Sequence, residues 1–228
     1  MAVVTPGKDT RQMLLNRRFI GTAMLGLGLV HATIAAMNLS PLMDSYFIGE
    51  VLDVNLENTF VVWLSSAALL SIALVAFAAA WLDPAKHTHT GWAVIGFAFV
   101  LLSVDETASL HELAGELAGR VASVSWLPSL YTWVIVVAPV AAIGAVWMLR
   151  WLGRTLGWRT AEGRMAVIAI LMWMTVPLLE AVDPTLGGPR LLVVIEESIE
   201  AGGEILLLWA VLLHVAAFDR RLPEVVPG

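Results

Sequence analysis

The sequence predicts an all-α integral membrane protein, a polytopic bundle of about six transmembrane helices. Three observations predict this fold: hydrophobic residues make up 59% of the 228 residues, only 14% are charged, and the apolar residues fall into six long runs. A soluble domain has about 25% charged residues, so this chain has too few to cover a water-facing surface. Helices are expected because lipid offers no water to satisfy backbone N–H and C=O groups.

The predicted spans are separated by short breaks. We expect the spans at residues 18–39, 58–82, 91–119, 131–153, 165–182 and 190–218, with turn residues between them at Ser40-Pro41, Asp83-Pro84, Pro128, Arg154 to Arg164, and Asp183-Pro184 with Gly187-Gly188. The first run is longer than the apolar part of a signal peptide and is interpreted as a retained span. The third run, about 43 Å long as a helix, exceeds a hydrocarbon core of about 30 Å, so its outer end is expected to project or to tilt.

The positions of the basic residues predict the orientation of the bundle. With the N-terminus inside, all of the 13 Lys and Arg residues except Arg120 and Arg190 fall in inner segments. The positive-inside rule therefore favours a topology with both termini in the cytoplasm. We expect a cytoplasmic segment at 1–17, a single transmembrane domain at 18–219 and a cytoplasmic tail at 220–228.

The composition excludes several classes of function. The chain has no cysteine, which excludes structural disulfides, thiolate zinc sites, iron–sulfur clusters and c-type haem. Its net charge of −6 and the absence of a basic cluster argue against nucleic acid as a partner. No phosphate loop, dinucleotide fingerprint or serine-hydrolase elbow is present. The expected partner is the lipid bilayer, with a membrane-protein partner or a second copy of the chain as alternatives.

The sixth run contains four acidic residues where a lipid-facing helix would have none. Glu196, Glu197, Glu200 and Glu204 share an arc about 100° wide on a helical wheel. An ionised residue at mid-membrane costs roughly 2.5–3.5 kcal/mol on the insertion scale. These side chains are therefore expected to face the bundle interior, water or a bound cation.

The third run contains a second set of acidic residues. On a continuous helix, Asp105, Ser109, Glu112 and Glu116 lie within about 60° of one another, and Glu106 and His111 are expected to point away on either side. Glu180 in the fifth run and His31 in the first complete the predicted cluster. Given the predicted topology, all of these residues lie at one level, in the outer half of the membrane.

A divalent metal ion is the favoured interpretation of this cluster, because carboxylates with one or two imidazoles suit manganese, iron, calcium or zinc. The predicted ligands are Asp105, Glu112, Glu180, Glu196, Glu200 and Glu204, with His111 and Glu106 as catalytic candidates of a metal-dependent membrane enzyme. The strict Glu-x-x-His pair of di-iron bundles is absent. A proton or cation pathway and a structural polar network in a non-catalytic accessory subunit remain alternatives.

Four other features have structural interpretations. The outer connection at 40–57 is either a lid along the membrane surface or a solvated loop. Gly202-Gly203 indicates close packing of helices. His31 is expected to be bonded to a neighbouring helix, and His214 to lie at the inner interface.

Two strings resemble a signature of bacterial multi-pass membrane proteins: Leu102-Ser-Val-Asp-Glu-Thr-Ala-Ser-Leu-His-Glu112 and Glu196-Glu-Ser-Ile-Glu-Ala-Gly-Gly-Glu204. The resemblance covers about 20 residues and the general hydropathy. It implies a location in the inner membrane, and it implies no activity. The chain differs from the ceramidase-like membrane hydrolases, whose zinc-binding set of histidines is missing here.

Overall fold

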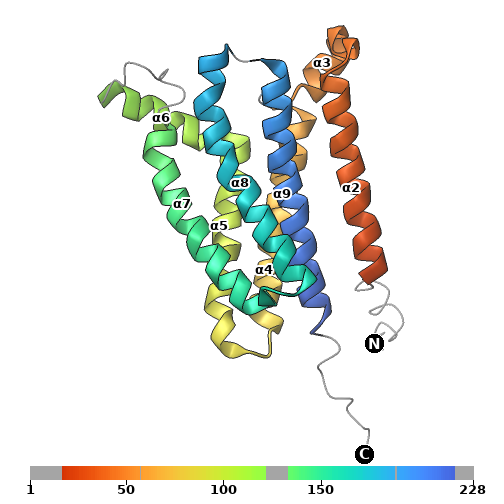
Figure 1. The fold of residues 1–228 in the computed structure, drawn as a ribbon, viewed down its shortest axis with the longest axis vertical. Coiled ribbons are helices and arrows are strands. Elements are labelled where there is room, and N and C mark those ends of the chain that lie inside the picture. Colours follow the sequence, from red (N-terminus) through yellow and green to blue (C-terminus); the bar gives the residue numbers. More distant parts are fainter. Residues whose placement is uncertain (1–16, 57, 122–132, 188, 219–228) are drawn as a thin grey trace, which may run out of the picture.

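The protein is a bundle of long helices, as Figure 1 shows for this computed structural model. The structure describes residues 17–56, 58–121, 133–187 and 189–218, and within these ranges it is helical with no β-strand. The long helices are α2 (Arg17–Asn38), α4 (Phe60–Leu82), α5 (His89–Ala108), α7 (Trp133–Leu152), α8 (Ala161–Leu186) and α9 (Arg190–Ala216). The all-α prediction is confirmed.

Five of the described helical segments are long and apolar enough to cross a membrane: Arg17–Asn38, Phe60–Leu82, Lys86–Ala108, Ala161–Glu180 and Arg190–Ala216. They correspond to five of the six predicted spans, so the protein is a membrane protein. The other predicted span, at 131–153, forms α7, a helix of 20 residues.

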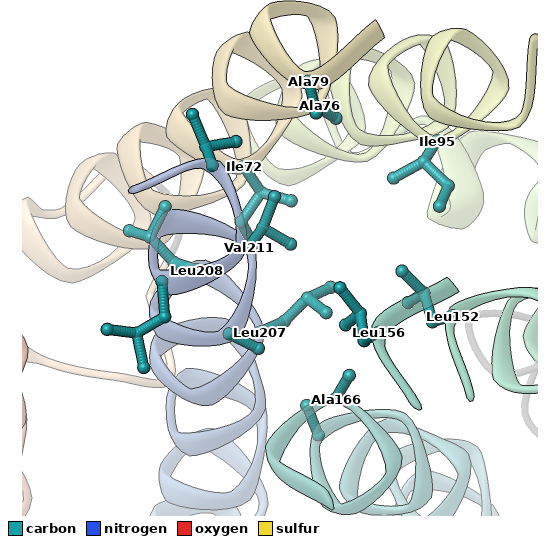
Figure 2. Packing of buried hydrophobic residues seen from close by; sticks show 14 of the residues in the cluster. Ile72, Ala76, Ala79, Ile95, Leu152, Leu156, Ala166, Leu207, Leu208 and Val211 are labelled. Carbon is teal, nitrogen blue, oxygen red and sulfur yellow. The ribbon is translucent and has the colours of Figure 1, made fainter. Parts of the chain in front are cut away.

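Helix α9 lies at the centre of the bundle and packs against α2, α4 and α8. Toward the end of α9 that carries Ala216, its side chains enter a dense apolar core with α4, α5 and α8. Figure 2 shows Leu207, Leu208 and Val211 of α9 packed beside Ile72 of α4. Leu207 and Val211 are completely buried, so closely packed apolar side chains surround this half of α9.

The third predicted span is two helices and not one. Helix α5 ends at Ala108, Ser109 adopts a left-handed conformation (φ 46°, ψ 44°), and α6 (Leu110–Val121) follows. Figure 1 shows α6 running across the end of the bundle, at a steep angle to α5. Asp105 stabilises the break, because its carboxylate accepts the backbone N–H of His111 and so caps the first turn of α6.

The fifth predicted span is longer than expected. Helix α8 continues through positions 183 and 184, where the sequence predicts a break, and reaches Leu186. It ends at Gly187, which has a φ of 80°. Glycine is the usual residue at this left-handed position after a helix, and here it marks the helix end better than the Asp-Pro pair does.

The outer connection forms two short helices, η1 (Pro41–Asp44) and α3 (Tyr46–Leu52). Tyr46 and Phe47 are 84% and 74% exposed. Exposed aromatic side chains next to a membrane span are typical of an interfacial segment, so the structure favours the lid interpretation over a solvated loop.

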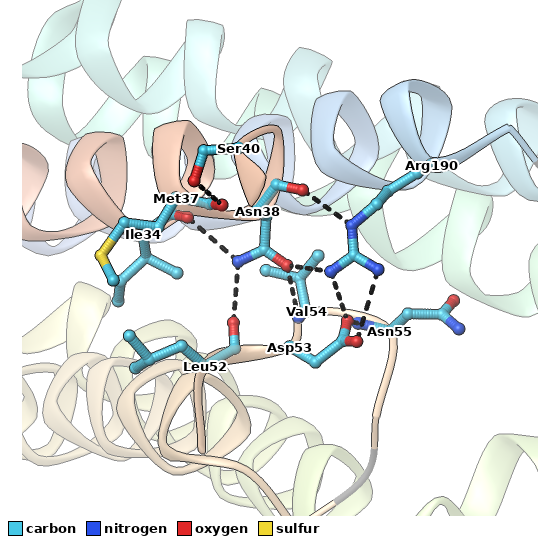
Figure 3. A network of polar contacts seen from close by, with 9 residues as sticks. All are labelled: Ile34, Met37, Asn38, Ser40, Leu52, Asp53, Val54, Asn55 and Arg190. Atoms are coloured by element: carbon cyan, nitrogen blue, oxygen red, sulfur yellow. Dashed lines mark hydrogen bonds and ion pairs between the residues drawn. The ribbon is translucent and has the colours of Figure 1, made fainter. Parts of the chain in front are cut away.

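Arg190 attaches this connection to the bundle (Figure 3). Its Nε donates to the backbone oxygen of Asn38 at 2.7 Å, and its Nη2 donates to Asn38 Oδ1 at 2.8 Å and to Asp53 Oδ1 at 3.1 Å. Asn38 is 1% exposed and its Nδ2 also donates to the Leu52 carbonyl at 2.7 Å. One arginine at the start of α9 thus joins the end of α2 to the residues that follow α3.

The first residue of α2 and the last residue of α9 lie at the same end of the bundle (Figure 1). The same end holds the connection between α4 and α5, with Lys86, and the turn after α7, with Arg154. Arg190 lies at the opposite end. The described basic residues are therefore segregated as the sequence predicts.

Candidate functional site

The acidic residues of α9 form a line that runs from one end of the helix to its middle. At 1.5 Å per residue, Glu196 lies about 9 Å and Glu204 about 21 Å along the axis from Arg190. Glu204 has no exposed surface, and Glu196, Glu197 and Glu200 are partly buried. None of the four points freely into lipid, as the cost of burying an ionised group requires.

Glu204 is the most buried of these acidic residues and is held by α4. Ser65 Oγ donates a hydrogen bond of 2.5 Å to Glu204 Oε1. The second oxygen, Oε2, is buried and has no hydrogen-bond partner in the described part of the chain. A buried carboxyl with one unsatisfied oxygen is costly, so this residue is a candidate for a functional role.

Asp105 and His111 form a pair at the junction of α5 and α6. Asp105 Oδ1 accepts the backbone N–H of His111 at 2.8 Å, and Oδ2 lies 3.0 Å from His111 Nδ1. Both carboxylate oxygens are therefore engaged. This use of Asp105 is structural, since it fixes the ring of His111 and the first turn of α6.

The acids of α9 interact electrostatically with residues of three other helices. The charges that act on Glu200 include those of Glu106, Asp105 and His111. Those that act on Glu197 include the charge of Glu180 on α8. The structure thus brings together the predicted residues from α5, α6, α8 and α9.

Glu106 and His111 were expected to point away from the acidic face on a helical wheel that assumed one continuous helix, and the left-handed Ser109 breaks that helix. The charge of Glu106 acts on Glu200 and Glu204, and that of His111 acts on Glu200. Glu116, predicted on the same face as Asp105, is exposed on α6. The side chain of Glu112 lies outside the described residues.

A pocket of about 370 Å³ opens beside this line of acids, between α2, α4 and α9. His31, Ser65, Glu197, Ser198 and Glu200 supply its polar lining, and the rest is apolar. The Nε2 atom of His31 is buried and has no hydrogen-bond partner in the described ranges, contrary to the expected bond to a neighbouring helix. Two carboxyls, an imidazole and two hydroxyls therefore line one cavity.

Close packing of α8 against α9 fixes the position of Glu200. Trp173 Nε1 on α8 donates to the backbone oxygen of Glu200 at 3.2 Å. A Cβ at Gly203 would lie 2.8 Å from Trp173 Nε1, and one at Gly202 would lie 2.7 Å from Met172 Cε. The predicted close contact at Gly202-Gly203 is confirmed.

The predicted metal site stays a prediction, because the side chain of Glu112, one of its proposed ligands, lies outside the described residues. Among the described residues, no three His, Asp or Glu side chains come together as a group that could hold one metal ion. Asp105 is already engaged by His111, and Glu204 is bonded to Ser65.

Sequence reasoning missed Ser65, Trp173 and Asn38. Ser65 and Asn38 have polar side chains, and the Trp173 ring carries one N–H donor. All three lie inside or at the end of an apolar run. A buried carboxyl needs a donor on a neighbouring helix, and Ser65, Ser66 and Ser71 are the serines within the apolar run of α4. Ser66 serves a different neighbour, since its Oγ donates to the backbone oxygen of Ser103 on α5 at 2.9 Å.

A second polar cluster lies at the other end of the bundle, after α4. Asp83 is buried and accepts bonds from Thr88 Oγ1 at 2.7 Å and Trp92 Nε1 at 3.3 Å, while His214 Nε2 lies 4.0 Å away. Burial by itself raises the pKa of Asp83, but the bonds from Ala85, Thr88 and Trp92 and the charge of His214 outweigh it, so the pKa is below its ordinary value. His214 also packs against Trp92, with 5.3 Å between ring centroids, and lies near the inner end of α9.

Comparison with known proteins identifies a family, and no activity is assigned to that family. No curated protein and no solved structure matches the chain. One family model matches residues 18–216, which include every long helix except the first residue of α2. The chain therefore belongs to the family described as a domain of unknown function, DUF8692.

Proposed function

We propose that the protein is a six-span membrane protein that takes up protons from the outer side of the membrane at the carboxyl cluster of α9. One observation carries this proposal. Glu204 is fully buried, is bonded to Ser65 through one oxygen and has no partner for the other, beside a pocket lined by Glu197 and Glu200.

Helix lengths and charges support the topology. Helix α7, with 20 residues, is about 30 Å long, which matches the hydrocarbon core. Counting α7 as a span gives six, with the ends of α2 and α9 on one side. The described basic residues at that end make it the cytoplasmic side, and the resemblance in sequence favours the inner membrane of a bacterium.

Charge balance supports protons as the species bound. The charges that act on Glu200 include those of the carboxyls Glu106, Glu196 and Asp105 and that of the imidazole His111. Neighbouring carboxylates in surroundings of low polarity repel one another, and a bound proton relieves that repulsion. A metal ion would do the same, but the described side chains do not converge as metal ligands do, so we derive no step through a metal.

The apolar core of Figure 2 supports uptake from one side. Between Glu204 and His214, about 15 Å further along α9, Leu207, Leu208 and Val211 fill the space against α4 and α8. Protons that reach Glu204 from the pocket therefore go no further in this arrangement of helices. The proposal therefore includes a second arrangement, in which α9 repacks and releases the proton to the cytoplasmic side, and proton flux across the membrane measures that complete cycle.

Proton flux into liposomes tests the proposal. Purified protein is reconstituted with a pH-sensitive dye inside, and a potassium diffusion potential drives proton entry. We expect flux with the wild-type protein, a loss of at least tenfold with Glu204→Gln, and no change with Glu50→Gln. Glu50 is exposed on α3, so the control makes the same chemical change away from the pocket.

Three results would contradict the proposal. Equal flux in wild type and Glu204→Gln would remove Glu204 from any pathway. No flux, together with a partner protein that co-purifies in fixed ratio, would favour the accessory-subunit alternative. A divalent metal that is retained in stoichiometric amount and lost in Glu200→Ala would favour the metal-dependent enzyme instead.

A further inference from the structure

A groove of about 490 Å³ lies on α7, far from the acid-lined pocket, near the cytoplasmic end of the bundle. Its apolar lining includes Ala142, Ile143, Val146 and Trp147, and two arginines, Arg150 and Arg154, close its inner end. The groove is therefore apolar at one end and positively charged at the other. Such a groove matches a molecule with an apolar body and an anionic head.

The two guanidinium groups are available to a ligand. Arg150 and Arg154 are both exposed, and neither forms an ion pair or hydrogen bond with any residue that the structure describes. Arg150 lies in the last turn of α7 and Arg154 in the π-helical turn η4 (Gly153–Gly157) that follows, and both line the same groove. Guanidinium groups in such an arrangement bind phosphate oxygens through paired N–H donors.

Two stacked tryptophan rings line one side of the groove. The rings of Trp147 and Trp151 stack with centroids 6.0 Å apart and an angle of 15° between planes. Trp151 is held in turn by Trp92 of α5, at 5.0 Å and nearly perpendicular. Its ring lies so close to Gly91 that a Cβ there would be 2.2 Å from it. Packing against α5 therefore fixes the positions of the two tryptophan rings.

The length of the groove matches one leaflet of a bilayer. From Ala142 to Arg150, α7 rises about 12 Å, close to half of a hydrocarbon core of about 30 Å. Tryptophan and arginine are typical of the level of the headgroups. An acyl chain placed along Ala142 and Val146 would bring its phosphate to the two arginines.

We propose that this groove binds one anionic phospholipid of the cytoplasmic leaflet, with the phosphate held between Arg150 and Arg154. The apolar length of the groove favours a membrane lipid over a free phosphate or a soluble anion. Selectivity for an anionic lipid over a zwitterionic one follows from two cations without carboxylate partners.

Native mass spectrometry of the detergent-solubilised protein tests this site with phosphatidylglycerol and phosphatidylcholine as probes. We expect one phosphatidylglycerol to be retained. The double variant Arg150→Gln/Arg154→Gln should weaken its binding about 30-fold, since each arginine at an anionic surface contributes roughly a fivefold factor. The matched control Arg159→Gln/Arg164→Gln makes the same charge change at the same end, outside the groove lining, and should change affinity less than twofold.

A third variant distinguishes lipid binding in the apolar groove from binding to the arginine charges alone. Ala142→Trp fills the apolar end of the groove and leaves both arginines in place, so phosphatidylglycerol binding should fall at least fivefold. Equal affinities for the two lipids, or an equal loss in the two double variants, would overturn the proposal. Unchanged binding in Ala142→Trp would show that the lipid binds only by surface charge, which also overturns it.

Discussion

The bond between Ser65 and Glu204 makes a quantitative prediction about stability. Ser65→Ala removes the only donor that the structure gives to Glu204 and leaves a fully buried carboxyl without hydrogen bonds. An unsatisfied buried group of this kind costs about 1–3 kcal/mol of the free energy of unfolding. Ser71→Ala is the control, because Ser71 lies on the same helix and its hydroxyl bonds only to the backbone oxygen of Ala67.

Removing the carboxyl should cancel this cost. Glu204→Leu replaces a buried acid by an apolar side chain of similar size, which is often neutral for stability. In that background Ser65→Ala should cost under about 1 kcal/mol, because both polar partners are then gone. The double-mutant cycle therefore predicts a coupling free energy on the order of 1–2 kcal/mol between the two residues.

Unfolding in detergent, followed by circular dichroism for all four members of the cycle, measures this coupling. The Ser71→Ala control should change the free energy of unfolding by under about 0.5 kcal/mol. A Ser65→Ala cost that is the same with and without Glu204 would refute the reasoning. It would mean that water or another donor satisfies the carboxyl.

Three further predictions concern the contacts around the site. Asn38→Ala removes the buried amide that joins Arg190, Leu52 and the end of α2. It should lower the free energy of unfolding by about 2–4 kcal/mol. The control Asn55→Ala changes an exposed residue and should leave the free energy of unfolding unchanged. Gly203→Ala should lower the melting temperature because its Cβ would lie 2.8 Å from Trp173 Nε1, whereas Gly28→Ala, with nothing within 4 Å, should raise or preserve it. Because the pKa of Asp83 is lowered by folding, its contribution to stability is complete above the ordinary Asp pKa of about 3.9 and is lost as pH falls through the folded value. Acid denaturation should therefore depend less steeply on pH in Asp83→Asn than in wild type, and an identical dependence would refute this assignment.

Hydropathy was sufficient to predict the long helices, because lipid offers no water to satisfy backbone groups and so leaves only helices. Five of the predicted runs each correspond to one long helix in the described ranges, and the third run corresponds to the two helices α5 and α6. Breaks within a run were harder to predict, since Ser109 adopts its left-handed conformation through a tertiary and capping arrangement with Asp105 and His111. Nothing in the composition of residues 105–111 requires it.

The acids of the site were predictable, and their partners were not. The rule that carboxyls do not face lipid identifies Glu196, Glu197, Glu200 and Glu204 from the sequence alone. Their geometry depends on which face of α5 meets α9, and a helical wheel for one continuous span could not follow the chain past the break at Ser109. Ser65 and Trp173 each supply one hydrogen bond from a different helix, and helix pairing cannot be deduced from a single sequence.

Accessibility of substituted cysteines from each side of the membrane tests the central claim most directly. The chain has no cysteine of its own, so Glu197→Cys, Glu200→Cys and Leu208→Cys each provide a single thiol. The account predicts that a membrane-impermeant thiol reagent added outside labels positions 197 and 200, that the same reagent added inside does not, and that position 208 resists both. Labelling of positions 197 and 200 from the cytoplasmic side, or no labelling of them from outside, would contradict it.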